Sequence, residues 1–185
     1  RSVPHEIVAR EVQGHDLAIV DNQPPSEYGP GESPAEVIQR LVRLSPRPVV
    51  AVPPRYQPDQ PRETILVALD GSTPASRAVF ALLASGLPSI GKLRLLTVHP
   101  DSKDAAKACA QSGVDYLRRH GVEADFDPIV SERSVSEVIC EEADRQQCEL
   151  VVLGPHGRPA LVEFFLGSVT RDVLDHSLVP VLVYH

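Results

Sequence analysis

The sequence has 185 residues, more than one average domain and fewer than two, which predicts one complete domain and part of another. Hydrophobic residues make up 42% of the chain and charged residues 23%, a composition typical of a globular protein with a packed core. A formal net charge of -7 argues against non-specific binding to nucleic acid or to an anionic membrane, and no apolar run reaches the roughly 18 residues of a membrane span. We therefore expect neither nucleic acid nor membrane among its partners.

The start of the chain and its thiols bear on its origin. The sequence begins with Arg1 and contains no methionine, so we expect further residues upstream, which leaves a removed signal peptide open. The three cysteines, Cys109, Cys140 and Cys148, have neither the spacing of metal ligands nor the even number of a disulfide set. We interpret them as reduced thiols of a cytoplasmic protein.

The first part of the chain resembles the C-terminal part at a nearly constant offset. Three short matches carry this interpretation: residues 1–3 with 133–135, 17–20 with 150–153, and 45–50 with 177–182. We therefore interpret residues 1–53 as the C-terminal half of a degenerate first repeat. Residues 54–62, polar and rich in proline, are expected to be a linker, and residues 63–185 a complete domain.

Residues 63–185 alternate between strand and helix patterns. Such alternation predicts a doubly wound α/β fold, a parallel sheet with helices on both faces. The expected strands are 64–69, 93–98, 124–130, 150–153 and 181–184, and the expected helices are 74–85, 104–120, 135–146 and 168–176. In a flavodoxin-like or Rossmann-like order of 3-2-1-4-5, the strand order reverses between the first and fourth of these strands.

Ligands of such sheets bind beyond the carboxyl ends of the strands at this reversal. There Asp70-Gly71-Ser72 would face Gly154-Pro155-His156-Gly157. Gly154 and Gly157 let the backbone approach a ligand, and Gly167-Ser168 begins a helix whose free amides suit a phosphate. The combination favours a nucleotide with its phosphates at Gly167.

Each element also has a simpler explanation. Gly154-Pro155 alone is a strand-ending turn, and Ser72 before Pro74 is a helix cap. Asp70 alone accepts amide hydrogen bonds in its own turn, and His156 alone is a solvated loop residue. Only their combination at one reversal point favours a binding site.

These motifs resemble the universal stress protein family, and the resemblance covers residues 63–185. The glycine loop matches the family's ATP-binding signature G-x2-G-x9-G-[ST], and Asp70-Gly71-Ser72 matches its opening motif. The resemblance implies the 3-2-1-4-5 sheet and bound ATP, with or without Mg²⁺. The residues that it implies in binding are Asp70, Ser72, the Val98 backbone, Gly154, His156, Gly157, Gly167, Ser168 and Val169.

The resemblance also implies that the last strand pairs with the last strand of another copy. In this chain it predicts Val49–Val52 beside Val181–Tyr184, an intrachain pseudo-dimer, and otherwise a homodimer. Two prolines depart from the binding pattern, since Pro155 removes a backbone donor from the loop and Pro159 stiffens it. In the first repeat, Asp21 and Glu36 stand near the positions of Gly154 and Ser168, where carboxylates would repel phosphate. We therefore expect the first repeat to be a non-binding structural half.

Three functions are compatible with these residues. The leading hypothesis is a cytoplasmic universal stress protein that binds ATP or a related adenine nucleotide in its second domain and changes conformation or partner affinity with occupancy. The alternative is a structural or interaction module that keeps the fold and the dimer edge without binding nucleotide. The third is slow ATP hydrolysis, but the sequence has no Walker lysine loop and no second acid placed to hold Mg²⁺ with Asp70. Any hydrolysis is expected to be incidental.

Overall fold

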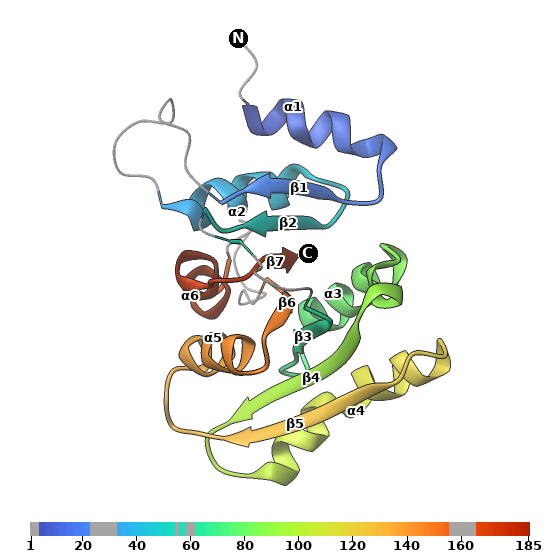
Figure 1. Cartoon of the computed structure of the whole chain (residues 1–185), viewed down its shortest axis with the longest axis vertical. Coiled ribbons are helices and arrows are strands. Elements are labelled where there is room, and N and C mark those ends of the chain that lie inside the picture. The colour runs from blue at the N-terminus through green and yellow to red at the C-terminus, as the bar shows by residue number, and fades with distance from the viewer. Residues whose placement is uncertain (1–3, 23–32, 55, 58–61, 156–165) are drawn as a thin grey trace.

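One mixed sheet organises the computed structural model, which describes residues 4–22, 33–54, 56–57, 62–155 and 166–185 (Figure 1). Its order is β1-β2-β7-β6-β3-β4-β5, and every neighbouring pair is parallel except β2 with β7. The strands are β1 Ala18–Asp21, β2 Val49–Val52, β3 Thr64–Ala68, β4 Lys92–His99, β5 Ala124–Val130, β6 Cys148–Leu153 and β7 Val181–Val183. The α-helices are α1 Pro4–Glu11, α2 Pro34–Leu44, α3 Thr73–Ala84, α4 Lys103–Arg119, α5 Val135–Arg145 and α6 Ser168–His176, with 3-10 turns at Val12–Gly14 and Leu87–Ile90.

The strand order predicted for residues 63–185 is confirmed. From β5 through β4, β3 and β6 to β7, the strands of residues 63–185 follow the order 3-2-1-4-5. The bounds of α6 agree with the expected ones, whereas β6 begins at Cys148 rather than Leu150 and β4 runs one residue past Val98. The reversal therefore lies between β3 and β6, as the site prediction requires.

Helices cover the two faces of the sheet with separate groups of buried side chains. On one face, residues of α1, α2, α5 and α6 pack together, among them Ile38, Ile139 and Leu174. On the other face, α3 and α4 contribute Val79, Leu82 and Leu117. Both groups consist mainly of Val, Leu, Ile and Ala. Within the described residues, no helix combines the length and the apolar character that a bilayer crossing requires.

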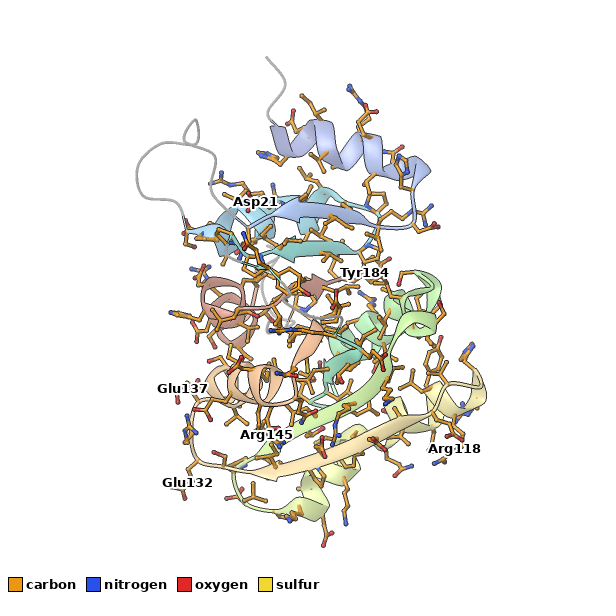
Figure 2. All side chains as sticks on the ribbon, viewed as in Figure 1. Asp21, Arg118, Glu132, Glu137, Arg145 and Tyr184 are labelled. Atoms are coloured by element: carbon orange, nitrogen blue, oxygen red, sulfur yellow. The ribbon has the colours of Figure 1, made fainter. Side chains whose placement is uncertain are left out.

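The predicted pairing of β2 with β7 is also confirmed. Val49, Val50 and Ala51 of β2 lie opposite Val183, Leu182 and Val181 of β7 in an antiparallel register. In Figure 2, Asp21, which ends β1, lies to the left of Tyr184, which follows β7. The carboxyl ends of the first two strands therefore point away from those of the last two.

Candidate functional site

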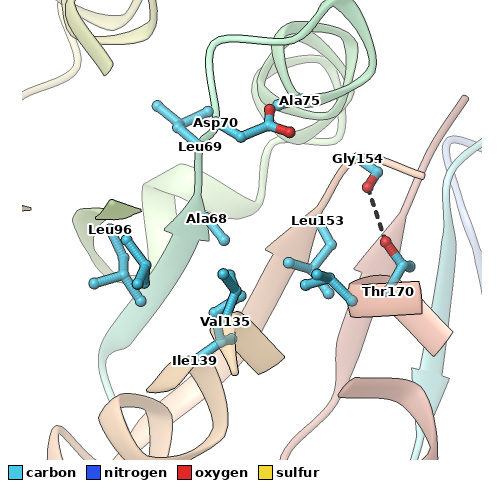
Figure 3. Close-up of a pocket in the computed structure, with 12 residues that line it drawn as sticks. Ala68, Leu69, Asp70, Ala75, Leu96, Val135, Ile139, Leu153, Gly154 and Thr170 are labelled. Carbon is cyan, nitrogen blue, oxygen red and sulfur yellow. Dashed lines mark hydrogen bonds between the residues drawn. The ribbon is translucent and has the colours of Figure 1, made fainter. Parts of the chain in front are cut away.

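The chain leaves β3 and β6 in opposite directions, and a cavity lies where the two connections separate. After β3 the chain continues through α3 to β4, and after β6 it continues to α6 and β7, on the other side. The cavity has a volume of about 210 Å³ and opens at the carboxyl ends of both strands (Figure 3). Its lining comes from β3, β4, β6 and the helices α3, α5 and α6: Ala68, Leu69, Asp70, Ala75, Leu96, Val98, Val135, Ile139, Leu153, Gly154, Val169 and Thr170.

Aliphatic side chains form most of this lining. Leu96 and Leu153 are buried in the wall, and Val135 and Ile139 of α5 lie beneath the cavity, whereas the carboxylate of Asp70 is exposed at its rim (Figure 3). A volume of about 210 Å³ is below the roughly 300–1,000 Å³ of most ligand pockets. The cavity therefore suits an aromatic ring or another compact apolar group, with any charged part of the same ligand outside it.

The turn after β3 is built by local hydrogen bonds. The Ser72 amide donates to Asp70 Oδ1 at 2.9 Å, and Gly71 between them has a φ of +79°, a left-handed conformation that favours glycine. The Ser72 hydroxyl accepts the Ala75 amide at 3.2 Å and caps α3. The simpler explanations of Asp70 as a turn acceptor and of Ser72 as a cap are thus both present in the structure. They hold the Asp70 carboxylate in a fixed turn beside the cavity.

Gly154 lets the end of β6 pack directly on the first turn of α3. A Cβ at this position would lie 2.4 Å from the Ala75 nitrogen and 2.5 Å from the Pro74 oxygen, closer than side-chain atoms come to a backbone. The Gly154 carbonyl accepts a hydrogen bond of 3.0 Å from Thr170 Oγ1, and this contact ties β6 to α6 (Figure 3). Gly154 therefore has a structural role that does not need a ligand.

The first turn of α6 presents backbone donors next to the cavity. Gly167 precedes the helix in an extended conformation and provides no side-chain cap, and Val169 and Thr170 line the cavity. Among the described residues, no acceptor is bound to the amides of Ser168 or Val169. Free amides and the positive end of the helix dipole suit an anion.

The start of α2, the helix that follows β1, has carboxylates bound to its backbone amides. Ser33 Oγ accepts the Glu36 amide, and Glu36 Oε2 accepts the Ser33 amide at 3.0 Å, which is a complete capping box. In addition, Asp175 Oδ1 of α6 accepts the Ala35 amide at 3.1 Å. An anion at this helix would compete with these two acids, whereas no carboxylate among the described residues accepts an amide of the first turn of α6.

The structure brings together some of the predicted site residues and not others. Asp70, Val98, Gly154 and Val169 all line the cavity, although Val98 lies within β4 and not at its last residue. Ser72 caps α3 beside it, and Gly167 and Ser168 begin α6 without lining it. His156 and Gly157 lie outside the described residues. The sequence interpretation did not include Thr170, Val135 or Ile139, and Thr170 is the one of these with a polar contact at the site.

Metal ligands were not assigned from the sequence. Within the described part of the chain, no group of three or more His, Cys, Asp or Glu side chains has the arrangement of a metal site. Asp70, the one acid among the predicted site residues, lies at the rim of the cavity.

Comparison with known proteins identifies similar chains. A family model described as the universal stress protein family matches residues 61–185. Universal stress protein Slr1230 of Synechocystis sp. (strain ATCC 27184 / PCC 6803 / Kazusa) is 26% identical over 149 residues, which are 80% of this chain and 50% of that protein. A universal stress protein encoded in the QAH/OAS sulfhydrylase 3' region of Thermus aquaticus is 29% identical over 136 residues, 65% of this chain and 97% of that protein. This chain thus spans about half the length of Slr1230.

Two solved structures share the fold. A universal stress protein from Archaeoglobus fulgidus DSM 4304 matches with a TM-score of 0.66 and 19% identity, over 98% of this chain and 66% of that one. A universal stress protein in complex with cAMP matches with a TM-score of 0.54 and 26% identity, over 68% of this chain and 98% of that one. The mixed sheet and its helices are therefore shared with proteins of known structure.

Proposed function

Since the chain belongs to the universal stress protein family, whose model matches well over half of it, we propose that residues 63–185 bind an adenine nucleotide. The base would lie in the cavity between β3 and β6, near the Val98 backbone, and the phosphates would lie outside it at the start of α6. Binding would adjust conformation or partner affinity in a stress response. Mg²⁺, where present, would be held by the phosphates and Asp70.

The observation that carries this proposal is the difference between α2 and α6. Both helices follow a parallel strand of the sheet, but the first amides of α2 are bound by Glu36, Ser33 and Asp175. The first turn of α6 has no side-chain cap and adjoins a cavity. An anion at α6 would satisfy amides that the described residues leave without an acceptor.

A relative with a bound nucleotide supports the choice of an adenine nucleotide. The universal stress protein in complex with cAMP is 26% identical to this chain and covers 68% of it. An adenine ring is a flat, compact group with an apolar face, which fits an aliphatic cavity of about 210 Å³. The small volume supports burial of the base alone.

We extend the proposal to the organisation of the chain. Residues 1–53 would be the C-terminal half of a first repeat that binds no nucleotide, and residues 54–62 would be a linker to the complete domain. The parallel pairs β1-β2 and β6-β7, each joined through a helix, support this assignment. A cytoplasmic location also stays a prediction.

The second candidate function is a structural or interaction module without nucleotide. The packing of Gly154 against Pro74 and Ala75 favours it, because that packing explains the glycine without a ligand. Pro155 also favours it, since it has no amide to offer to a phosphate.

Thermal unfolding with ATP, ADP, AMP and cAMP at millimolar concentration separates the two functions. A ligand that binds only the folded chain raises the melting temperature, and at 100 times Kd it stabilises by about 2.7 kcal/mol. For a chain of this size each kcal/mol corresponds to roughly 2–4 °C. If none of the four nucleotides shifts the transition, the nucleotide proposal fails and the interaction module is favoured.

A further inference from the structure

The two halves of the molecule are related by an approximate two-fold axis that can be read from equivalent contacts. In the antiparallel pair of β2 and β7, Val50 lies opposite Leu182, a residue 132 positions later. Ser45 Oγ donates to the Arg47 carbonyl at 2.8 Å, and Ser177 Oγ, again 132 positions later, donates to the Val179 carbonyl at 2.7 Å. The same offset therefore relates strands, turns and hydrogen bonds of both halves.

Helices α2 and α6 pack against each other across this axis. Arg171 Nη2 donates to Gln39 Oε1 at 3.5 Å, and these two residues are themselves 132 positions apart. A contact between equivalent positions places the axis between them. The Ala35 amide bound to Asp175 Oδ1 at 3.1 Å lies to one side of it. Under the same axis, Gly167 is the equivalent of Ala35, and Arg43 is the equivalent of Asp175. The axis therefore places Arg43 beside Gly167.

The two equivalent positions, Asp175 and Arg43, carry opposite charges. At the start of α2, the Asp175 carboxylate accepts a backbone amide, and it marks where an anion lies in this arrangement. By the same axis, the equivalent position at the start of α6 is that of Arg43, an exposed cation in the last turn of α2. A guanidinium and a backbone amide are both donors, so they cannot bind each other and together suit an anion between them.

We infer that Arg43 contacts the phosphates of the nucleotide at the start of α6, so that the first part of the chain completes the site of the second. This inference rests on the proposed function and adds a residue to the same site. The cavity beside Val169 and Thr170 supplies the second half of the ligand contact. Planar guanidinium groups bind phosphate oxygens in pairs, which gives Arg43 more than the effect of a point charge.

The test compares ATP and adenosine, because adenosine has no phosphate. Calorimetric titrations of both ligands would use the full chain, Arg43→Ala, and Arg10→Ala as a control. Arg10 is an exposed arginine of α1 that pairs with Glu11. We expect Arg43→Ala to bind ATP at least about tenfold more weakly and adenosine unchanged, with a smaller dependence of ATP binding on salt. Arg10→Ala should bind both ligands like the parent, and Arg43→Lys should recover part of the ATP affinity.

Three other outcomes of these titrations distinguish the inference from the proposed function on which it rests. Equal ATP affinity of Arg43→Ala and the parent would overturn the inference and leave the nucleotide site intact. An equal loss for ATP and adenosine would also overturn it, because Arg43 would then act on the fold or the base and not on phosphate. A parent chain that binds neither ligand would refute the proposed function, and the inference with it.

Discussion

Replacing Gly154 with alanine tests whether the site is built on the close contact between β6 and α3. The added Cβ would lie 2.4 Å from the Ala75 nitrogen and from the Pro74 carbonyl carbon. Both are backbone atoms of the first turn of α3, so no side-chain rotation relieves the overlap. The end of β6 or the start of α3 must move.

The size of the effect follows from the rigidity of the contact. Overpacking in a core costs about 1–3 kcal/mol, and an overlap with backbone belongs at the upper end of that range. For a chain of 185 residues, a loss of about 3 kcal/mol lowers the melting temperature by roughly 6–12 °C. Because the shift separates two walls of the cavity, nucleotide affinity should fall as well.

Calorimetric or fluorescence melting of the nucleotide-free protein measures this effect. Gly14→Ala is the matched control, since a Cβ on Gly14 meets no atom within 4 Å. We expect Gly14→Ala to melt within about 2 °C of the parent. If Gly154→Ala also melts within that range, the packing argument is wrong, and the glycine serves only the approach of a ligand.

Three further predictions each concern a single side chain: Thr170, Asp175 and Cys148. Thr170→Val removes the donor to the Gly154 carbonyl and should cost about 1–2 kcal/mol of stability. Thr97→Val, at a buried hydroxyl with no partner among the described residues, should be neutral or stabilising. Urea unfolding of both variants checks this, and equal losses of stability would contradict it. Asp175→Ala leaves the buried Ala35 amide without its acceptor and should cost about 1–3 kcal/mol of stability. Asp144→Ala, on the exposed surface of α5, should cost little. A parent-like unfolding midpoint for Asp175→Ala would show that the contact is not formed in solution. Burial raises the pKa of the Cys148 thiol to about 11, so the folded state keeps a proton that the unfolded state loses above pH 9. The contribution of this thiol to stability therefore falls as pH rises from 9 to 11, and Cys148→Ala should reduce the decline of the melting temperature over this range. Fast alkylation of Cys148 at pH 9 in the folded protein would contradict this prediction.

The sequence predicted the parts of the fold that depend on local patterns. The Ser72 cap, the bounds of α6 and the order of the last five strands follow from turn residues, helix caps and the alternation of strand and helix. The pairing of β2 with β7 came from the family resemblance, and the register confirms it. These features need no knowledge of how distant side chains pack.

Features that depend on packing between distant elements were missed. Thr170 shares the buried face of α6 with Val173 and Leu174, so a hydroxyl at helical spacing among apolar residues was a signal that could have marked it. The contact of Gly154 with α3 had no such signal, because it depends on where two elements 80 residues apart in sequence meet. Tyr56 lies in the segment expected to be a polar linker, yet it packs against the core, which composition alone did not indicate.

The proposed function requires that the phosphates of a nucleotide bind at the start of α6. Calorimetric titration of ATP with Mg²⁺ into the parent, Ser168→Glu and Ser112→Glu tests this most directly. Both serines are exposed, and Ser112 lies on α4, away from the site. A carboxylate at residue 168 interacts favourably with the positive end of the helix dipole, so Ser168→Glu should keep the stability of the fold while it repels phosphate. Binding by the parent and by Ser112→Glu but not by Ser168→Glu is the result that we predict; equal binding by all three, or binding by none, would contradict the proposal.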